Sequence, residues 1–233
     1  MRTAPRPGRM RGLTLIELLV ALALLSLLAL LSWRTLDGMT RAQSITQEQL
    51  NRWSNWQTAL AQWDADLDAA LATEQVPPLD FDGRVLRLTR SDPDRDTNGG
   101  LRVIGWSLQA DPASGALRWA RWTSAPLRRI GELEQAWEQA AQWGRNPGTQ
   151  DRLQQVLLTP VTAWQLFYHR GGTWSNPQSA EDSNDPDTDP ATELAAKALP
   201  DGVRLLLTLP TGDNPGGQLV RDWVRPSLGG EGQ

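Results

Sequence analysis

The sequence contains no cysteine, and its 233 residues include one histidine, His169, and one lysine, Lys197. Without cysteine, the chain cannot form disulfides, use a thiolate nucleophile or bind zinc and iron–sulfur clusters through sulfur. A single histidine cannot build a histidine-based metal cluster. We therefore expect no cofactor. The compartment stays open, because a protein of an oxidising space can simply lack disulfides.

Charge and aromatic residues are unevenly used. The net charge of −4 argues against a nucleic-acid partner, because nucleic-acid binders usually have a basic surface. The 12 tryptophans stand against two phenylalanines and one tyrosine, and all but one of the 23 basic residues are arginine. We interpret both biases as coding bias. Averaged over its length, the composition is that of a soluble globular protein.

The first 33 residues depart from this average. Residues 1–12 hold four arginines and no acid, and residues 13–33 are almost all apolar. At about 1.5 Å per residue, a helix of this length just spans a hydrocarbon core of about 30 Å. Arginines before the span orient the N-terminus toward the cytoplasm. We expect a single-pass membrane protein whose larger part lies on the far side.

Two residues distinguish this segment from an ordinary secretory signal. Gly12 precedes the apolar stretch, so cleavage after it would remove the basic leader and leave the apolar helix attached. Glu17 places a carboxylate inside the apolar run, at a cost of about 2.5–3.5 kcal/mol on insertion scales. A new α-amine at Leu13, on this chain or a neighbouring subunit, would be its charge partner. The alternative is an uncleaved signal anchor that tolerates one acid.

The order of these residues resembles the class III leader of type IV pilins and type II secretion pseudopilins. The matching run is Gly12-Leu13-Thr14-Leu15-Ile16-Glu17, followed by the apolar stretch. The resemblance implies that a prepilin peptidase cuts between Gly12 and Leu13 and N-methylates Leu13. It also implies that Glu17 supports assembly. The family prefers phenylalanine where this chain has Leu13, a departure that bears on methylation efficiency.

Apolar residues continue beyond the membrane segment at steps of three and four. They are Leu50, Trp53, Trp56, Leu60, Trp63, Leu67 and Leu71. This spacing predicts one face of an amphipathic helix. We expect a helix over residues 13–72, lipid-facing over 13–33, with an amphipathic segment over 34–75 and an end at Pro77-Pro78. The tryptophan stripe is expected to be the core of a soluble domain.

Beyond this helix the hydrophobic pattern has period two, which predicts strands. The predicted strands are 84–90, 101–109, 116–123, 161–169, 203–209 and 218–224, and the predicted short helices are 132–142 and 151–157. Residues 111–115 predict a hairpin turn. Together they predict an α+β fold, an antiparallel meander on one long helix, with its β-rich domain over residues 76–225. The acidic segment 176–193 is expected to be a loop and 226–233 a flexible tail.

The C-terminal part resembles the J-type minor pseudopilin of type II secretion. Residues 162–174 and 199–209 carry the resemblance, and residues 63–67 and 34–38 also fit. Glu17 speaks against the K-type subunit, which typically lacks that acid. The resemblance implies a pilin-like fold, a bacterial inner-membrane location and a periplasmic domain. It further implies a structural role near the pseudopilus tip with I-type and K-type subunits, in support of the export of folded proteins.

Three alternatives remain open. A minor pilin of a type IV pilus is less favoured, because many pilins close a C-terminal loop with a disulfide and this chain has no cysteine. A signal-anchored periplasmic enzyme requires a catalytic constellation, and His169 reads as a structural strand residue. The carboxylate pairs Asp64/Asp66 and Asp80/Asp82 read as ordinary surface pairs. The third alternative is a binding module that keeps its leader.

One metal motif is present in part. Asp94, Asp96 and Asn98, followed by Gly99, match the first half of a calcium-binding loop. The twelfth position would be Gly105 in place of a bidentate glutamate, and the flanking segments are predicted strands instead of helices. Aspartate, asparagine and glycine are equally expected in a hydrophilic turn. The turn is therefore the favoured interpretation, with calcium as the alternative.

Overall fold

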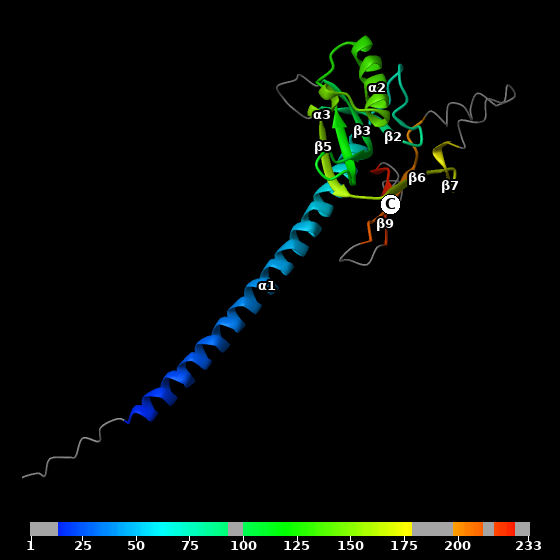
Figure 1. Ribbon diagram of the computed structural model, residues 1–233. Coiled ribbons are helices and arrows are strands. Elements are labelled where there is room, and N and C mark those ends of the chain that lie inside the picture. The colour runs from blue at the N-terminus through cyan, green and yellow to red at the C-terminus, as the bar shows by residue number, and fades with distance from the viewer. Residues whose placement is uncertain (1–13, 93–99, 179–197, 212–216, 227–233) are drawn as a thin grey trace, which may run out of the picture. The chain divides into compact units, whose positions relative to one another are not determined.

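The structure is a computed structural model, and it describes residues 14–92, 100–178, 198–211 and 217–226 (Figure 1). The chain divides into two compact units, residues 1–53 and residues 54–233. Several residues singled out above lie outside the described ranges. They are Gly12, Leu13, Asp94, Asp96, Asn98, most of segment 176–193 and nearly all of segment 226–233.

The first element is α1, a helix over Leu15–Asp68. By length and composition it is the one helix of the described chain that could cross a membrane. Within the first unit every described residue of α1 is exposed. Within the second unit, the face that holds Ala59, Trp63 and Leu67 is buried. The tryptophan stripe is thus core where α1 meets the domain and exposed before it.

Helix α1 ends at Asp68, four residues before the predicted end. The backbone that follows pairs with a neighbouring strand instead of continuing the helix. The Leu71 N–H donates to the Thr89 carbonyl at 2.8 Å, and the Ser91 N–H donates to the Ala69 carbonyl at 3.4 Å. Local periodicity could not predict this, because the competing partner lies about 20 residues along the chain.

In the described part of the chain, nine strands form two antiparallel sheets. Sheet A has the order β1-β2-β3-β4-β5, and sheet B has the order β7-β6-β8-β9. Their bounds are Leu79–Phe81 (β1), Val85–Ser91 (β2), Leu101–Ala110 (β3), Leu117–Thr123 (β4), Gln155–Pro160 (β5), Ala163–Arg170 (β6), Thr173–Ser175 (β7), Gly202–Thr208 (β8) and Gln218–Val224 (β9). Two helices, α2 (Ile130–Arg145) and α3 (Thr149–Leu153), connect β4 to β5. The α+β class, with a long helix packed on antiparallel sheets, is confirmed.

Sheet A has a hydrophobic cluster on each face, because successive side chains of a strand point to opposite sides. On one face, Val85, Val103 and Trp122 pack with the apolar side of α2. On the other face, a second cluster joins sheet A to the end of α1 and to sheet B. Its fully or nearly fully buried members include Trp63, Leu86, Ile104, Trp106, Trp119, Val203, Leu205 and Trp223. The end of α1 therefore lies in a core shared by both sheets.

The predicted meander differs from the structure mainly at residues 151–157, which were predicted to be helical. Helix α3 ends at Leu153, and β5 begins at Gln155, which pairs with Trp122 of β4. Pairing with a distant strand overrides the local pattern there. The hairpin turn at 111–115 is confirmed, with Gly115 at a φ of 71° that favours glycine. The short strands β1 and β7 were not predicted.

Candidate functional site

The N-terminal end of α1 is capped by its own side chains. The Glu17 N–H donates to the Thr14 hydroxyl at 3.3 Å, and the Thr14 N–H reaches back to a Glu17 carboxylate oxygen at 3.5 Å. This reciprocal arrangement is a capping box, which satisfies donors that a helix start leaves free. The carboxylate also lies at the positive end of the helix dipole. Thr14 was not singled out from the sequence, although its three-residue spacing to Glu17 is the known signal.

The capping box lowers the free-energy cost of placing the Glu17 carboxylate in an apolar segment. Its carboxylate has local donors, so it is not left without partners in lipid. The predicted cleavage pair, Gly12 and Leu13, immediately precedes Thr14 and lies outside the described residues. The α-amine that cleavage would create remains a predicted partner of Glu17.

The apolar run that follows is exposed on all sides. Large side chains from Leu15 to Leu31 are each more than half exposed, for example Leu15 at 78% and Leu25 at 63%. The one hydroxyl within this stretch is internally satisfied, because Ser26 Oγ donates to the Leu22 carbonyl at 2.7 Å. Monomeric soluble proteins rarely expose apolar patches of this size. The surface requires lipid or other protein around it.

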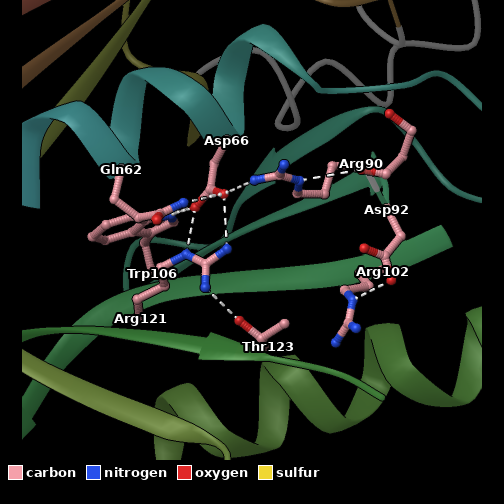
Figure 2. A network of polar contacts seen from close by, with 9 residues as sticks. Gln62, Asp66, Arg90, Asp92, Arg102, Trp106, Arg121 and Thr123 are labelled. Carbon is pink, nitrogen blue, oxygen red and sulfur yellow. Dashed lines mark hydrogen bonds and ion pairs between the residues drawn. The ribbon is translucent and has the colours of Figure 1, made fainter. Parts of the chain in front are cut away.

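The opposite end of α1 carries a buried carboxylate, Asp66, whose side chain is fully inaccessible (Figure 2). Arg121 of β4 pairs with it in bidentate fashion, from Nε to Oδ2 at 2.7 Å and from Nη2 to Oδ1 at 2.8 Å. Arg90 of β2 adds Nη1 to Oδ1 at 2.5 Å. Trp106 Nε1 and Gln62 Nε2 donate at 3.0 and 3.1 Å. The carboxylate thus accepts hydrogen bonds from four side chains.

The strand period explains why these groups converge. Arg90 follows buried Leu88 by two residues, and Arg121 follows buried Trp119 by two, so both arginines point to the face that α1 covers. Trp106 lies on the same face of β3. Burial of a charge is tolerated only when it is paired and hydrogen-bonded, a condition that the arginines fulfil. Asp66 therefore fastens α1 to sheet A.

Two neighbouring aspartates fasten the same turn to sheet B. Arg221 of β9 donates through Nη2 to Asp64 at 2.5 Å, and Trp223 Nε1 donates to Asp68 at 2.7 Å. Asp64 and Asp68 are four residues apart and share one face of the helix, whereas Asp66 lies between them on another face. Acids are unfavourable at the negative end of a helix dipole, so these three need partners. Each of them has at least one.

The prediction that Asp64/Asp66 and Asp80/Asp82 are ordinary surface pairs is wrong for Asp66, and incomplete for the others. Asp66 is fully buried because it follows Trp63 by three residues on the packed face. Asp80 is paired with Arg87 and is 13% exposed, and Asp82 is paired with Arg145. All four carboxylates form ion pairs with arginines of the same domain.

The remaining candidates from the sequence are His169 and the partial calcium loop. The His169 ring packs on Trp174 of β7 with centroids 5.1 Å apart. Among the described residues, no group of three or more histidine, cysteine or acidic side chains is arranged to hold a metal ion. The calcium alternative concerned Asp94, Asp96 and Asn98, which are not among those residues.

Comparison with known proteins extends these observations. The prokaryotic N-terminal methylation motif matches residues 8–33, which include the last five residues of the predicted leader, Glu17 and the apolar run. The chain is 26% identical over 208 residues to type II secretion system protein J of Vibrio cholerae serotype O1, and the alignment covers 86% of this chain and 82% of that protein. These two matches support a pseudopilin of the J type. The predicted resemblance is confirmed.

The J-type pseudopilins are a structural family and not an enzyme family. A leader of the pilin type and one N-terminal apolar helix fit a single-pass protein of the inner membrane. Helix α1 accordingly combines two features. Its start lies within the methylation motif, and its last turn contacts both sheets of the domain.

Proposed function

We propose that this chain is a minor pseudopilin of a type II secretion machinery. It spans the bacterial inner membrane once through the first part of α1, with its N-terminus in the cytoplasm and its β-rich domain in the periplasm. It assembles with I-type and K-type minor pseudopilins near the pseudopilus tip and thereby supports export of folded proteins. The observation that carries this proposal is the exposed apolar helix that starts at the Thr14–Glu17 capping box, within a methylation motif.

Processing is the first step of the proposed function. A prepilin peptidase cuts between Gly12 and Leu13 and methylates the new amine of Leu13. The motif match over residues 8–33 supports this step. Cleavage removes four arginines and leaves a positive amine near Glu17, and the two opposite charges then neutralise each other in lipid.

Assembly is the second step. Between the apolar run and the domain, α1 exposes further large apolar side chains, among them Trp33 at 73% and Trp53 at 66%. Lipid does not cover Trp53 if the span ends near residue 33, because about 20 residues of helix extend roughly 30 Å further. Helices of neighbouring pseudopilins are the cover that we propose. Exposed tryptophan is also a frequent anchor of protein interfaces.

A minor pilin of a type IV pilus is the second candidate, because the leader motif is shared. The similarity over 86% of the chain to a type II secretion protein favours the secretion assignment. A signal-anchored enzyme has no supporting observation among the described residues.

Co-purification from membranes tests the proposal. Tagged full-length chain, extracted in mild detergent, is expected to recover I-type and K-type subunits made in the same cell. Glu17→Ala is expected to leave insertion and cleavage intact and to reduce recovery of these subunits at least several-fold. Thr14→Ala separates the two roles of the motif, because it removes the cap and keeps the charge. Glu48→Ala, an exposed acid of the same helix, is the matched control.

The outcomes are distinct. Loss of partners with Glu17→Ala alone assigns assembly to the charge. Equal loss with Thr14→Ala assigns it to the helix start. Normal recovery with Glu17→Ala contradicts the assembly role, and failure of wild type to recover either subunit contradicts the proposed partners.

A further inference from the structure

One end of sheet B gathers more positive than negative charge. Arg170 is the last residue of β6, Asp201 precedes β8 and Arg225 follows β9. These strands are neighbours, and their backbones are bonded at this end. The Asp201 N–H donates to the His169 carbonyl and the Arg225 N–H donates to the Asp201 carbonyl, both at 2.9 Å. The register therefore places Arg170, Asp201 and Arg225 at neighbouring positions across three strands.

The single carboxylate is engaged mainly by one of the two arginines. Arg225 Nη2 lies 3.5 Å from Asp201 Oδ1, and Arg225 Nε donates to the Pro200 carbonyl at 3.3 Å. Arg170 has no carboxylate within ion-pair distance among the described residues.

Arg170 has few partners for a partly buried guanidinium. Its Nη2 donates to the Ala198 carbonyl at 2.8 Å, and its Cζ lies 5.2 Å from the centroid of the Tyr168 ring. Its Nε is buried and donates to no described residue. A guanidinium carries five N–H donors in a fork that fits a carboxylate. Burial lowers the pKa of Arg170 below that of a free arginine, and the opposing effects of Tyr168 and Asp201 do not cancel this shift.

The contrast with a second arginine on the same sheet is informative. Arg204 of β8 is satisfied within the chain, because its Nε and Nη2 both donate to Asp222 at 2.7 Å. We propose that Arg170 and Arg225 form an oxyanion site at this end of sheet B, and that its occupant is a carboxylate of a neighbouring subunit. The site itself stands on the geometry, whereas the identity of the occupant rests on the proposed function.

Titration with small anions tests the site in the full-length chain in detergent micelles. Arginine Nε–H signals are followed by NMR while sodium acetate replaces sodium chloride at constant ionic strength. The Arg170 signal is expected to shift in a saturable manner. Arg225→Gln is expected to raise the apparent dissociation constant for acetate at least tenfold. Arg204→Gln, which removes a satisfied arginine of the same sheet, is expected to leave it unchanged.

Three results overturn the site. The first is an Arg170 signal that does not shift, and the second is a shift that rises linearly with acetate and does not saturate. The third is an equal acetate affinity of wild type and Arg225→Gln. The source of the carboxylate is tested separately by co-purification of Arg170→Gln/Arg225→Gln. Several-fold weaker recovery of partner subunits, with acetate binding in the wild type, supports a subunit carboxylate. Unchanged recovery overturns that occupant and leaves a free anion, independently of whether the chain is a pseudopilin.

Discussion

Helix α1 has two parts that share one secondary structure and differ in their surroundings. Over residues 15–53 every side chain is exposed, and hydroxyls such as those of Thr35 and Thr46 bond to carbonyls of the helix itself. Over residues 54–68 the helix buries Trp63 and Leu67 and pairs Asp64, Asp66 and Asp68 with two sheets. In this chain, helix formation therefore does not require packing against the domain.

The first part depends on surroundings that the described residues do not supply. Its backbone is satisfied by the helix, which is the condition for a segment in lipid. Its apolar surface stays uncovered until a membrane or another subunit covers it. The second part is held by its own domain. Substitutions of one residue type in the two parts should therefore have different effects.

The largest expected effect comes from tryptophans placed ten residues apart. Trp63→Ala should lower the free energy of unfolding of the domain by about 3–5 kcal/mol, because it leaves a cavity among Trp106 and Trp119. Trp53→Ala, at 66% exposure, should change it by less than about 0.5 kcal/mol. Urea unfolding of the full-length chain in detergent, followed by circular dichroism, measures both. Equal losses of stability in the two variants would contradict the difference in packing between the two parts of α1.

The next effect concerns the buried carboxylate. Asp66→Asn keeps the shape and removes the charge that faces Arg90 and Arg121, so it should cost about 2–3 kcal/mol in the same unfolding measurement. Asp37→Asn, which breaks the exposed pair with Arg41, is the control within the first part of α1 and should be nearly neutral.

A triple replacement sharpens the interpretation of Asp66. Asp66→Leu with Arg90→Met and Arg121→Met removes all three charges together, so no buried charge is left unpaired. Its stability should return to within about 2 kcal/mol of wild type or exceed it. If the triple variant is less stable than Asp66→Asn, the ion pairs contribute net stability and the reasoning from desolvation is wrong.

A smaller effect is expected on the sheet B side of the same turn. Asp64→Ala breaks the pair with Arg221, whose side chain is nearly half exposed, and should cost about 0.2–1 kcal/mol. If Asp64→Ala lowers the free energy of unfolding as much as Asp66→Asn does, exposure does not determine how much each ion pair contributes to stability.

The smallest effect is a pH dependence. The hydrogen bonds from Arg204 lower the pKa of Asp222 below its ordinary value of 3.8. A carboxyl group whose pKa is lowered by folding stabilises the fold at a pH above its pKa in the unfolded chain. This stabilisation is lost as the pH falls through its pKa in the folded chain. Asp222→Asn should therefore have a slightly shallower loss of stability below about pH 4 than wild type. Identical acid transitions would contradict the assignment.

Parts of this picture could be predicted from the sequence and parts could not. The helix, the leader motif and the central strands follow from periodicity and residue order. The Thr14–Glu17 cap was equally accessible, because both residues are local. Asp66 was not, since its partners Arg90 and Arg121 lie 24 and 55 residues away and are defined only once the strands have a register. Strand β5 was mispredicted for the same reason, as its pairing with β4 is long-range.

The most direct test of the account is the mass of the N-terminal peptide of the protein extracted from membranes. Processing predicts a peptide that begins at Leu13 and carries one methyl group on its α-amine, because the methylation motif spans the cleavage pair. A peptide that retains residues 1–12 would contradict it, and would leave α1 as the signal anchor of an unprocessed protein.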